Sequence, residues 1–553
     1  VGSEMCIRDR LVPLVIAAVI DTGIAGGNRG YVIRMCLLLV GFGIVGLVFS
    51  ITAQYFAAKA SVGFVTKLRH ALFDHIQGLS YTELDTIGTS TLITRMTSDM
   101  NQVQSGMNLT LRLLLRSPFV VFGAMIMAFT IDVKAALIFA AAIPVLSLVV
   151  FGIMLWCIPL YKRVQRKLDG VLSATRENLT GVRVIRAFCK EEEQISRFDA
   201  CNQDLTRTQK YVGRISALMN PVTYILINLA IIWLVYTGAL RVDVGLISQG
   251  AVVALYNYMS QILVELIKLA NLIINITKSV ACGNRIQSVF EIRSSLDAPE
   301  QAPAPKDFSY AVEFDHVTLR YANAGDDSLS DISFAARPGE TIGVIGSTGS
   351  GKSSLVNLIP RFYDASAGQV LVDGINVKEY PLDDLRNRIG VVPQKAVLFK
   401  GTIRDNLRWG NPDATDDQLL EAVQTAQAGE VLAQKGGLDF ELEQGGKNLS
   451  GGQKQRFTIA RALVKHPKIL ILDDSASALD FATDAALRKA IREMPGNPTV
   501  FIVSQRTSSL QHADQILVLE DGAVVGAGTH TQLLESCPVY QEIYQSQFRK
   551  EDA

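Results

Sequence analysis

The sequence predicts two kinds of domain in one chain: a bundle of membrane-spanning α-helices, followed by an α/β domain that binds a nucleoside triphosphate. The first indication is composition. Of the 553 residues 49% are apolar, the mean hydropathy is +0.25, and most of this apolar excess lies before residue 280. The second indication is residues 341–354, TIGVIGSTGSGKSS, which place a glycine-rich phosphate-binding pattern directly after a short apolar run. Together they predict a membrane protein with a nucleotide-binding domain.

Membrane spans are predicted from apolar runs of roughly 20 residues or more. Glu265 and Lys268 interrupt the last of these runs, and residues 11–20 form only half a span. The first ten residues, VGSEMCIRDR, resemble neither a signal peptide nor an amphipathic helix start. We therefore expect the true first helix to be cut short here and its beginning to be replaced by unrelated sequence. The predicted spans are residues 31–58, 106–131, 135–160, 218–240 and 250–276.

The distribution of Lys and Arg predicts the orientation of these spans. Residues 59–105 contain four and residues 161–215 contain twelve, whereas the connections 21–30, 132–134 and 241–249 contain one each. The two long hydrophilic stretches and the C-terminal half should therefore lie in the cytoplasm. Both stretches have a helical pattern, so the membrane helices should extend well beyond the lipid.

Domain boundaries follow from a change of composition. The stretch DAPEQAPAPKD (residues 297–307) contains three prolines and no periodicity, as is typical of a linker. We predict a transmembrane domain at 1–296, a linker at 297–309 and a nucleotide-binding domain at 310–553, where short β-type runs alternate with helical stretches. This arrangement predicts a multi-pass protein of the cytoplasmic membrane, in contact with the lipid bilayer.

Some classes of partner and site are not favoured. Lys plus Arg and Asp plus Glu both number 53, so no global charge indicates nucleic-acid binding. The seven cysteines form no CxxC pair, which argues against a disulfide framework or a zinc site.

The phosphate-binding pattern predicts contacts to the nucleotide. A strand, a glycine loop and a helix N-terminus direct backbone N–H groups at a phosphate chain. Lys352 can reach the β- and γ-phosphates, and the Ser353 hydroxyl can ligate Mg²⁺. The predicted nucleotide-binding residues of this loop are Gly346, Ser347, Thr348, Gly349, Ser350, Gly351, Lys352, Ser353 and Ser354.

Two further patterns belong to the same chemistry. The run ILILD (residues 469–473) predicts a buried parallel strand that ends in Asp473, which is well placed to hold Mg²⁺ through water. The run LSGGQ (residues 449–453) precedes a predicted helix and offers a second anion site at the helix N-terminus. Its candidate ligands are Ser450, Gly451, Gly452 and Gln453.

These residues resemble the ATP-binding cassette transporters, and in particular half-transporters of the exporter type, over about residues 11–545. The resemblance implies a six-helix membrane domain, ATP and Mg²⁺ as cofactors, and a second half-transporter as partner. It implies that Tyr321 stacks on adenine, although a strand aromatic packed in a core is the alternative. It also implies that Gln394 contacts Mg²⁺ and that residues 477–480 contact the partner across the dimer.

Two residues depart from the family pattern. Where the family has a glutamate that positions or deprotonates the attacking water, this sequence has Asp474. Where the family has a histidine at the γ-phosphate, it has Gln505. Both changes fall in one composite site while the other motifs are intact, so we predict a site that binds Mg-ATP and hydrolyses it slowly. Neutral drift is the alternative explanation.

The impaired site resembles that of one subunit of the heterodimeric multidrug-type exporters. The sequence thus predicts ATP-driven export as half of a heterodimer, with a drug-like, lipid or peptide substrate left open. Two alternatives remain: a membrane-bound ATP-binding regulator that does not pump, and a homodimeric exporter in which Asp474 is active.

Coupling and substrate contacts are predicted less sharply. The resemblance implies that residues 88–99 and 181–192 dock on the cassettes, although solvated helix faces would have the same composition. Arg112 and Arg116, and likewise Glu265 and Lys268, lie one turn apart near or within predicted spans. Intramembrane charges are candidates for function, but long side chains near a span end can also reach the headgroups.

Overall fold

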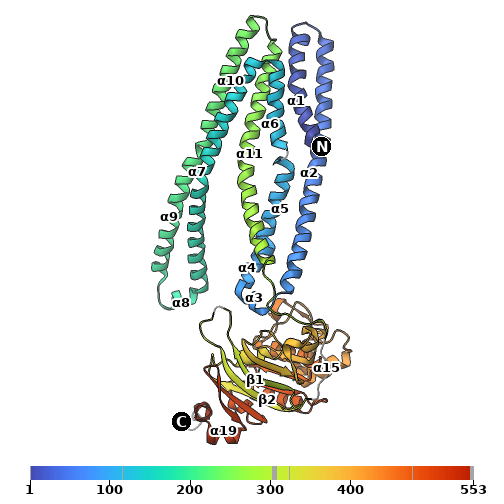
Figure 1. Ribbon diagram of the computed structural model, residues 1–553, viewed down its shortest axis with the longest axis vertical. Coiled ribbons are helices and arrows are strands. Elements are labelled where there is room, and N and C mark those ends of the chain that lie inside the picture. The colour runs from blue at the N-terminus through green and yellow to red at the C-terminus, as the bar shows by residue number, and fades with distance from the viewer. Residues whose placement is uncertain (1, 115, 302–307, 323, 476, 549–553) are drawn as a thin grey trace. The chain divides into compact units, whose positions relative to one another are not determined.

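The computed structural model describes residues 2–114, 116–301, 308–322, 324–475 and 477–548. Two compact units are present (Figure 1). The membrane unit consists of residues 1–77 and 90–291, and the cassette unit consists of residues 78–89 and 292–553. The chain thus enters the cassette unit twice, first with a short helical segment and then with its C-terminal half.

The membrane unit is entirely helical in its described part, as Figure 1 shows. Several of its helices contain a π-helical turn or continue directly from one. The α-helices are α1 (Gly2–Ala18), α2 (Arg29–Gln77), α4 (Thr89–Thr94), α5 (Met100–Leu109), α6 (Arg116–Ile131), α7 (Val133–Thr180), α8 (Val182–Ala187), α9 (Glu191–Ala217), α10 (Met219–Asp243) and α11 (Gln249–Phe290), and the π-helical turns are η1 (Val19–Ile24), η2 (Arg95–Asp99) and η3 (Thr110–Leu114).

The predicted spans are confirmed as helices. Each of the five overlaps a described helical stretch that is long and apolar enough to cross a membrane: Arg29–Gln77, Thr89–Ile131, Val133–Thr180, Glu191–Asp243 and Gln249–Leu269. α2 has 49 residues and α7 has 48. At 1.5 Å per residue each is about 70 Å long, more than twice the roughly 30 Å of a hydrocarbon core. The predicted extension of the helices beyond the lipid follows from these lengths.

Small side chains allow the membrane helices to pack closely. Ala124, Ala128, Ala135 and Ala136 are buried in one cluster with larger apolar side chains of α10 and α11. Close approach of small residues is a common way to pack helices in lipid. Asp132 caps α7 through the Ala135 N–H at 2.9 Å and pairs with a basic side chain of α10, so this turn has no uncompensated carboxylate.

The cassette unit has two main sheets and helices around them (Figure 1). The four-stranded sheet is antiparallel, in the order β2-β1-β4-β5. The six-stranded sheet has the order β12-β11-β3-β10-β9-β6 and is parallel except for β12. The strands are β1 (Val312–Leu319), β2 (Leu329–Ala336), β3 (Thr341–Gly346), β4 (Ala367–Val372), β5 (Ile375–Asn376), β6 (Ile389–Val392), β7 (Gly401–Thr402), β8 (Glu441–Leu442), β9 (Ile469–Asp473), β10 (Thr499–Val503), β11 (Gln515–Glu520) and β12 (Ala523–Gly528).

Helices complete the cassette unit. They are α3 (Tyr81–Ile87), α12 (Lys352–Leu358), α13 (Leu382–Arg388), α14 (Ile403–Arg408), α15 (Asp416–Thr425), α16 (Gly429–Gln434), α17 (Gly451–Leu463), α18 (Phe481–Arg492), α19 (His530–Ser536) and α20 (Pro538–Phe548), with 3₁₀ turns η4 (Val377–Glu379), η5 (Gln444–Gly446) and η6 (Thr507–Ser509). β9 and β10 are buried along their whole length, as expected for central strands covered on both faces.

The predicted linker at 297–309 lies in the cassette unit, and its residues 302–307 fall outside the described residues. The backbone oxygen of Asp297 accepts a hydrogen bond from the buried Arg361 guanidinium at 2.7 Å. This guanidinium also binds Asp364 at 2.8 Å. One end of the linker is thereby attached to the cassette. The division between the units falls at residue 291, five residues before the predicted boundary.

α3 is the first helix in the sequence that belongs to the cassette unit. The Tyr81 ring packs 4.8 Å from the Phe362 ring, and the Tyr363 hydroxyl donates to Asp85 at 2.6 Å. These contacts lie within the cassette unit and precede residues 88–99, whose docking stays a prediction. Polar composition could not separate these neighbouring stretches, because the contact depends on aromatic side chains nearly 300 positions apart.

Candidate nucleotide-binding site

The candidate site begins at the turn between β3 and α12. Gly349 and Gly351 adopt left-handed backbone conformations, with φ of +89° and +93°, which side-chain-bearing residues rarely adopt. A Cβ atom at Gly351 would also lie 2.6 Å from the Ser328 carbonyl oxygen. The turn therefore requires glycine at this position. The N-terminus of α12 follows immediately, and its free N–H groups favour an anion.

Lys352 is held inside this turn. Its ammonium donates to the carbonyl oxygens of Gly346 at 3.0 Å and Ser347 at 2.5 Å, and it lies 3.4 Å from the Ser350 hydroxyl. Burial lowers the pKa of the Lys352 ammonium, while the nearby carboxylates of Asp474 and Asp473 act in the opposite direction. The charge of Lys352 is thus positioned beside the phosphate turn before any ligand is considered.

Ser353 and Asp473 meet at the same edge. The Ser353 hydroxyl donates to the Asp473 carboxylate at 2.9 Å, which joins the first turn of α12 to the C-terminal end of β9. Burial raises the pKa of the Asp473 carboxyl, and the neighbouring Asp474 adds to this, whereas the Ser353 hydrogen bond opposes it. Among the described residues no group of three or more His, Cys, Asp or Glu side chains is present that could hold a metal alone. A hydroxyl and a carboxylate fit Mg²⁺, which commonly keeps waters and takes further oxygens from phosphates.

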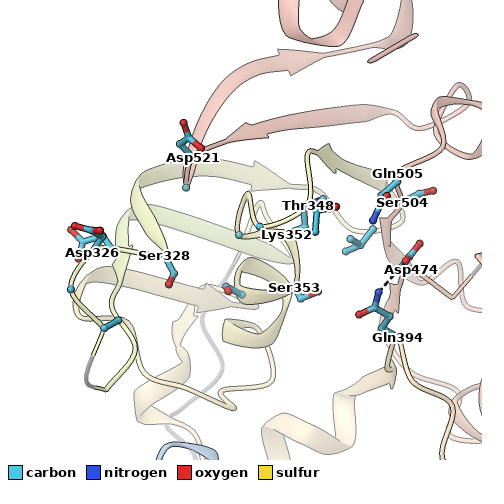
Figure 2. A pocket seen from close by; sticks show the side chains of 18 residues that line it. Asp326, Ser328, Thr348, Lys352, Ser353, Gln394, Asp474, Ser504, Gln505 and Asp521 are labelled. Atoms are coloured by element: carbon cyan, nitrogen blue, oxygen red, sulfur yellow. Dashed lines mark hydrogen bonds between the residues drawn. The ribbon is translucent and has the colours of Figure 1, made fainter. Parts of the chain in front are cut away.

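Asp474 and Gln505 face the same pocket from neighbouring strand ends (Figure 2). Asp474 follows β9 with φ of +45°, and its N–H donates to the Val503 carbonyl at 3.0 Å. Its carboxylate accepts a hydrogen bond from the Gln394 side chain at 3.2 Å. The structure thus brings together Lys352, Gln394, Asp474 and Gln505.

The pocket has a volume of about 760 Å³, within the usual range for ligand sites. Part of its lining was not identified from the sequence. The turn between β1 and β2 and the Asp-Gly turn between β11 and β12 both contribute. In sequence they are typical surface turns. In the structure both Gly351 and Gly522 lie close to the Ser328 carbonyl, and this places the two turns at the pocket. The lining residues are Ala324, Gly325, Asp326, Asp327, Ser328, Thr348, Gly349, Gly351, Lys352, Ser353, Ser354, Gln394, Asp474, Val503, Ser504, Gln505, Asp521 and Gly522.

Tyr321 lies beside this pocket and is not part of its lining. Its hydroxyl donates to the Ser354 hydroxyl at 2.9 Å, and its ring makes an edge-on contact with Tyr363, with 5.0 Å between ring centroids. Ser354 itself lines the pocket. The aromatic ring is therefore attached to the phosphate-binding helix on one side and, through Tyr363, to α3 on the other.

The LSGGQ segment lies outside the pocket lining. Ser450 caps α17: its hydroxyl accepts from the Gln453 N–H, and the Gln453 side chain accepts from the Ser450 N–H at 3.0 Å. Among the described residues, no atom outside the adjoining turn of α17 lies within 4 Å of a Cβ built on Gly451, whereas a Cβ on Gly452 would lie 2.8 Å from the Ala478 carbonyl oxygen. Ser450 and Gly451 are both exposed at the helix start.

Residues 477–480 connect the site to α18. The Ser477 hydroxyl donates to the Asp474 carbonyl at 2.8 Å, and Asp480 caps α18 through the Thr483 N–H at 2.8 Å. This segment therefore runs from the end of β9 past the start of α17, which its Ala478 carbonyl approaches at Gly452.

Two family models match the chain. The model described as ABC transporter transmembrane region matches residues 9–266, and the model described as ABC transporter matches residues 329–477. An uncharacterized ABC transporter ATP-binding protein of Mycobacterium tuberculosis strain H37Rv, Rv1273c, is 38% identical over 540 residues, covering 97% of this chain and 93% of the relative. YfiB of Bacillus subtilis strain 168 is 36% identical over 540 residues, covering 98% and 94%.

A more distant relative carries a more specific name. The "Fatty acid ABC transporter ATP-binding/permease protein" of Mycobacterium tuberculosis strain CDC 1551 is 31% identical over 484 residues, or 87% of this chain and 76% of the relative. Among solved structures, "a bacterial Atm1-family ABC exporter with ATP bound" matches with a TM-score of 0.81 at 22% identity, covering 99% and 96% of the two chains. This likeness establishes the exporter-type fold. The chain is thus a member of the ABC transporter family, an ATP-driven, multi-pass membrane half-transporter of exporter-type fold with one cytoplasmic ATP-binding domain.

Proposed function

We propose that the chain is the hydrolysis-impaired half of a heterodimeric exporter: its own ATP site binds Mg-ATP but turns it over slowly, and its LSGGQ segment completes the active site of a partner subunit. One observation carries this proposal. Asp474 and Gln505, the two departures from the family pattern, line the same pocket as an otherwise intact phosphate site.

The first reason for slow hydrolysis is the reach of Asp474. Aspartate is one methylene shorter than glutamate, so its carboxylate is withdrawn by roughly 1–1.5 Å, and a misplacement of about 1 Å can cost about 100-fold in rate. In addition, one oxygen of the Asp474 carboxylate accepts the Gln394 amide. Both features oppose the positioning of an attacking water.

The second reason is the missing positive charge at Gln505. A glutamine can donate a hydrogen bond to a phosphate oxygen but cannot become cationic. Charge that develops on the transferring phosphoryl group is therefore stabilised less than it would be by a protonated histidine. The backbone carbonyl of Gln505 accepts a hydrogen bond from the Gln547 side chain at 2.7 Å, and this bond holds the backbone in place at this edge of the pocket.

ATP binding needs neither residue. Lys352 and the N–H groups of the phosphate turn would hold the phosphates, while Ser353, Asp473 and Gln394 would hold Mg²⁺. A bound Mg²⁺ supplies charge neutralisation between the β- and γ-phosphates. We place the impairment at the chemical step rather than at binding.

The LSGGQ segment supports the role in a partner site. Ser450 and Gly451 are exposed, and a Cβ on Gly451 would have open space beyond its own helix turn in the described part of the chain. A free helix N-terminus with an exposed hydroxyl suits a phosphate brought by a second subunit. The cargo is proposed only as a class, drug-like, lipid or peptide, and the name of the fatty-acid relative favours lipid.

The test compares variants in the complex purified from membranes through a tag on this chain. Gly451→Ala should disturb only the contact between the LSGGQ segment and the nucleotide of the partner, because the added Cβ has open space among the described residues of this chain. We expect it to abolish most ATPase activity, while Asp474→Asn changes the activity little. Gly429→Ala, at another helix start with no atom nearer than 3.9 Å to its Cβ, is the matched control.

The alternatives give different results. If Asp474→Asn is the more damaging change, the site of this subunit is the working one and the heterodimer proposal fails. A chain that purifies as a homodimer, with ATPase activity that Asp474→Asn removes, would establish the homodimeric exporter. A non-pumping regulator would retain ATP binding in a complex that moves no cargo in membrane vesicles at saturating ATP.

A further inference from the structure

The membrane unit contains a cavity between α2 and α5 with a volume of about 420 Å³. Five of its eight lining residues are polar, and none of the eight carries a carboxylate. The remaining walls are apolar. The lining residues are Ala58, Ser61, Val62, Gln104, Ser105, Asn108, Leu109 and Arg112.

Arg112 supplies the charge of this cavity. It lies in the π-helical turn η3, at the point where α5 gives way to α6, and it is exposed. Within the part of the chain that the structure describes, no hydrogen bond or ion pair engages its guanidinium. π-helical turns are often found at functional sites, and a charge in a membrane domain is costly unless a partner compensates it.

The acidic charge in this unit is compensated differently. Glu265 is buried and accepts hydrogen bonds from the Ser117 hydroxyl at 3.1 Å and the Lys268 ammonium at 3.0 Å. Neither residue of the Glu265–Lys268 pair lines the cavity, and Arg116 does not line it either. Of the four candidate charges, Glu265 and Lys268 pair with each other in α11, Arg116 has an interaction elsewhere, and Arg112 faces the open cavity.

The position of the cavity indicates where a ligand would come from. Ala58 and Ser61 lie at the cytoplasmic end of the α2 span, and Arg112 lies six residues into the predicted span 106–131. Six helical residues correspond to about 9 Å. The cavity therefore lies across the boundary between headgroups and acyl chains on the cytoplasmic side.

The polar lining suits one class of group. The Asn108 amide lies 3.5 Å from the hydroxyl of the buried Ser61, and the Gln104 and Ser105 side chains continue this polar edge toward the cytoplasm. The Ser61 hydroxyl already donates to the Ala58 carbonyl at 3.0 Å and so holds the Asn108 amide in place. The Gln104, Ser105 and Asn108 side chains can donate hydrogen bonds to a ligand, and Arg112 adds a fork suited to carboxylate or phosphate. Val62 and Leu109 offer apolar surface to methylene groups.

We propose that this cavity binds the anionic headgroup of a single- or double-chain amphiphile from the cytoplasmic leaflet, with Arg112 as its counter-charge. Basic pockets between membrane helices on the cytoplasmic side are suited to anionic lipid headgroups. A free fatty acid and an anionic phospholipid share this chemistry. The proposal does not depend on the asymmetry of the ATP sites, because binding in the membrane unit requires no hydrolysis.

The test is photolabelling of the full-length chain, in the complex it forms, after reconstitution into nanodiscs of phosphatidylcholine. The three probes are a photoreactive fatty acid, a photoreactive phosphatidylglycerol and a photoreactive monoacylglycerol without charge, and labelled peptides are mapped by mass spectrometry. We expect an anionic probe to label peptides containing residues 58–62 and 104–112. Arg112→Gln should lower this labelling about tenfold or more, since it removes a charged hydrogen-bond donor.

Lys59→Gln is the matched control. Lys59 is exposed one residue from Ala58, at the same depth, and its ammonium lies 5.9 Å from the Tyr55 ring rather than in the cavity lining. Labelling should be unchanged in Lys59→Gln. It should be largely retained in Arg112→Lys, because this variant keeps the positive charge, and retained labelling would also show that the substitution at residue 112 leaves the helix intact.

Several results would overturn the proposal: equal labelling by the uncharged probe, equal loss in Lys59→Gln, or no labelling of these peptides in the wild-type complex. The last would mean that the partner subunit fills the cavity. Labelling by the fatty acid alone supports a transported carboxylate, and labelling by phosphatidylglycerol alone supports a resident phospholipid.

Discussion

Replacement of Lys352 by alanine tests the assignment of the nucleotide site most directly. The Lys352 ammonium has three donors, and the carbonyl oxygens of Gly346 and Ser347 occupy two of them. The third donor makes only a long bond of 3.4 Å to the Ser350 hydroxyl, which a phosphate oxygen can replace. The group is already held in place, so little side-chain ordering is needed on binding. A hydrogen bond to a charged group contributes about 1.5–3 kcal/mol. The loss should weaken ATP binding about 10- to 150-fold.

The assay is titration of the full-length chain in detergent or nanodiscs with a fluorescent ATP analogue. Lys468→Ala is the control. Lys468 belongs to the same domain, its side chain is 66% exposed, and its ion pair with Asp373 is long at 3.9 Å. It should leave the dissociation constant unchanged. A melting temperature close to wild type in Lys352→Ala would separate lost binding from lost folding. Unchanged affinity in a folded Lys352→Ala variant would refute the assignment of the phosphate site.

Three further predictions concern the surroundings of this site. Tyr321→Ala should raise the ATP concentration for half-saturation and leave the rate at saturating ATP unchanged, as measured by steady-state ATPase assays. Tyr363→Phe, which removes the 2.6 Å bond to Asp85, should reduce the ATP-induced change in spin-label distances within the membrane domain. Because coupling is reciprocal, ATP affinity should change by the same small factor, which a titration measures. His316 is paired with Asp331, which raises the pKa of the imidazole. The stabilisation from this pair is present below the pKa that His316 has in the unfolded chain, and it is lost as the pH rises through the pKa of His316 in the folded protein. The variant His316→Gln should therefore lower the melting temperature at about pH 5.5 and leave it unchanged at about pH 9.

Much of the fold could be predicted because its signals are local. Apolar runs long enough to cross a bilayer identified the five spans, and the phosphate turn identified β3 and α12 without any long-range information. The position of Asp473 at the end of a buried strand could likewise be predicted from five residues in sequence. These features depend on the local sequence of each segment and not on its tertiary contacts.

The contacts of α3 were missed for the opposite reason. The Tyr81 ring packs against Phe362, and Asp85 accepts from Tyr363, across 278 or more positions in sequence. Nothing in the local pattern of residues 81–87 indicates that they pack on the cassette. The cavity at Arg112 could not be predicted either, since it depends on how the polar edge of α5 is placed against α2.

Asp474 shows where sequence and structure must be combined. The sequence predicts impairment because Asp474 and Gln505 both depart from the family pattern, but drift stays an alternative since a carboxylate remains at this position. The structure adds that its backbone is in the left-handed region, with φ of +45°, and that its N–H donates to Val503 on the next strand. A backbone held in this way cannot easily advance to compensate for a shorter side chain. Because Gln394 also donates to the Asp474 carboxylate at 3.2 Å, movement toward an attacking water would require that bond to break. The backbone hydrogen bond to Val503 and the side-chain hydrogen bond from Gln394 thus both hold Asp474 in place, and they are the structural support for the slow hydrolysis proposed above.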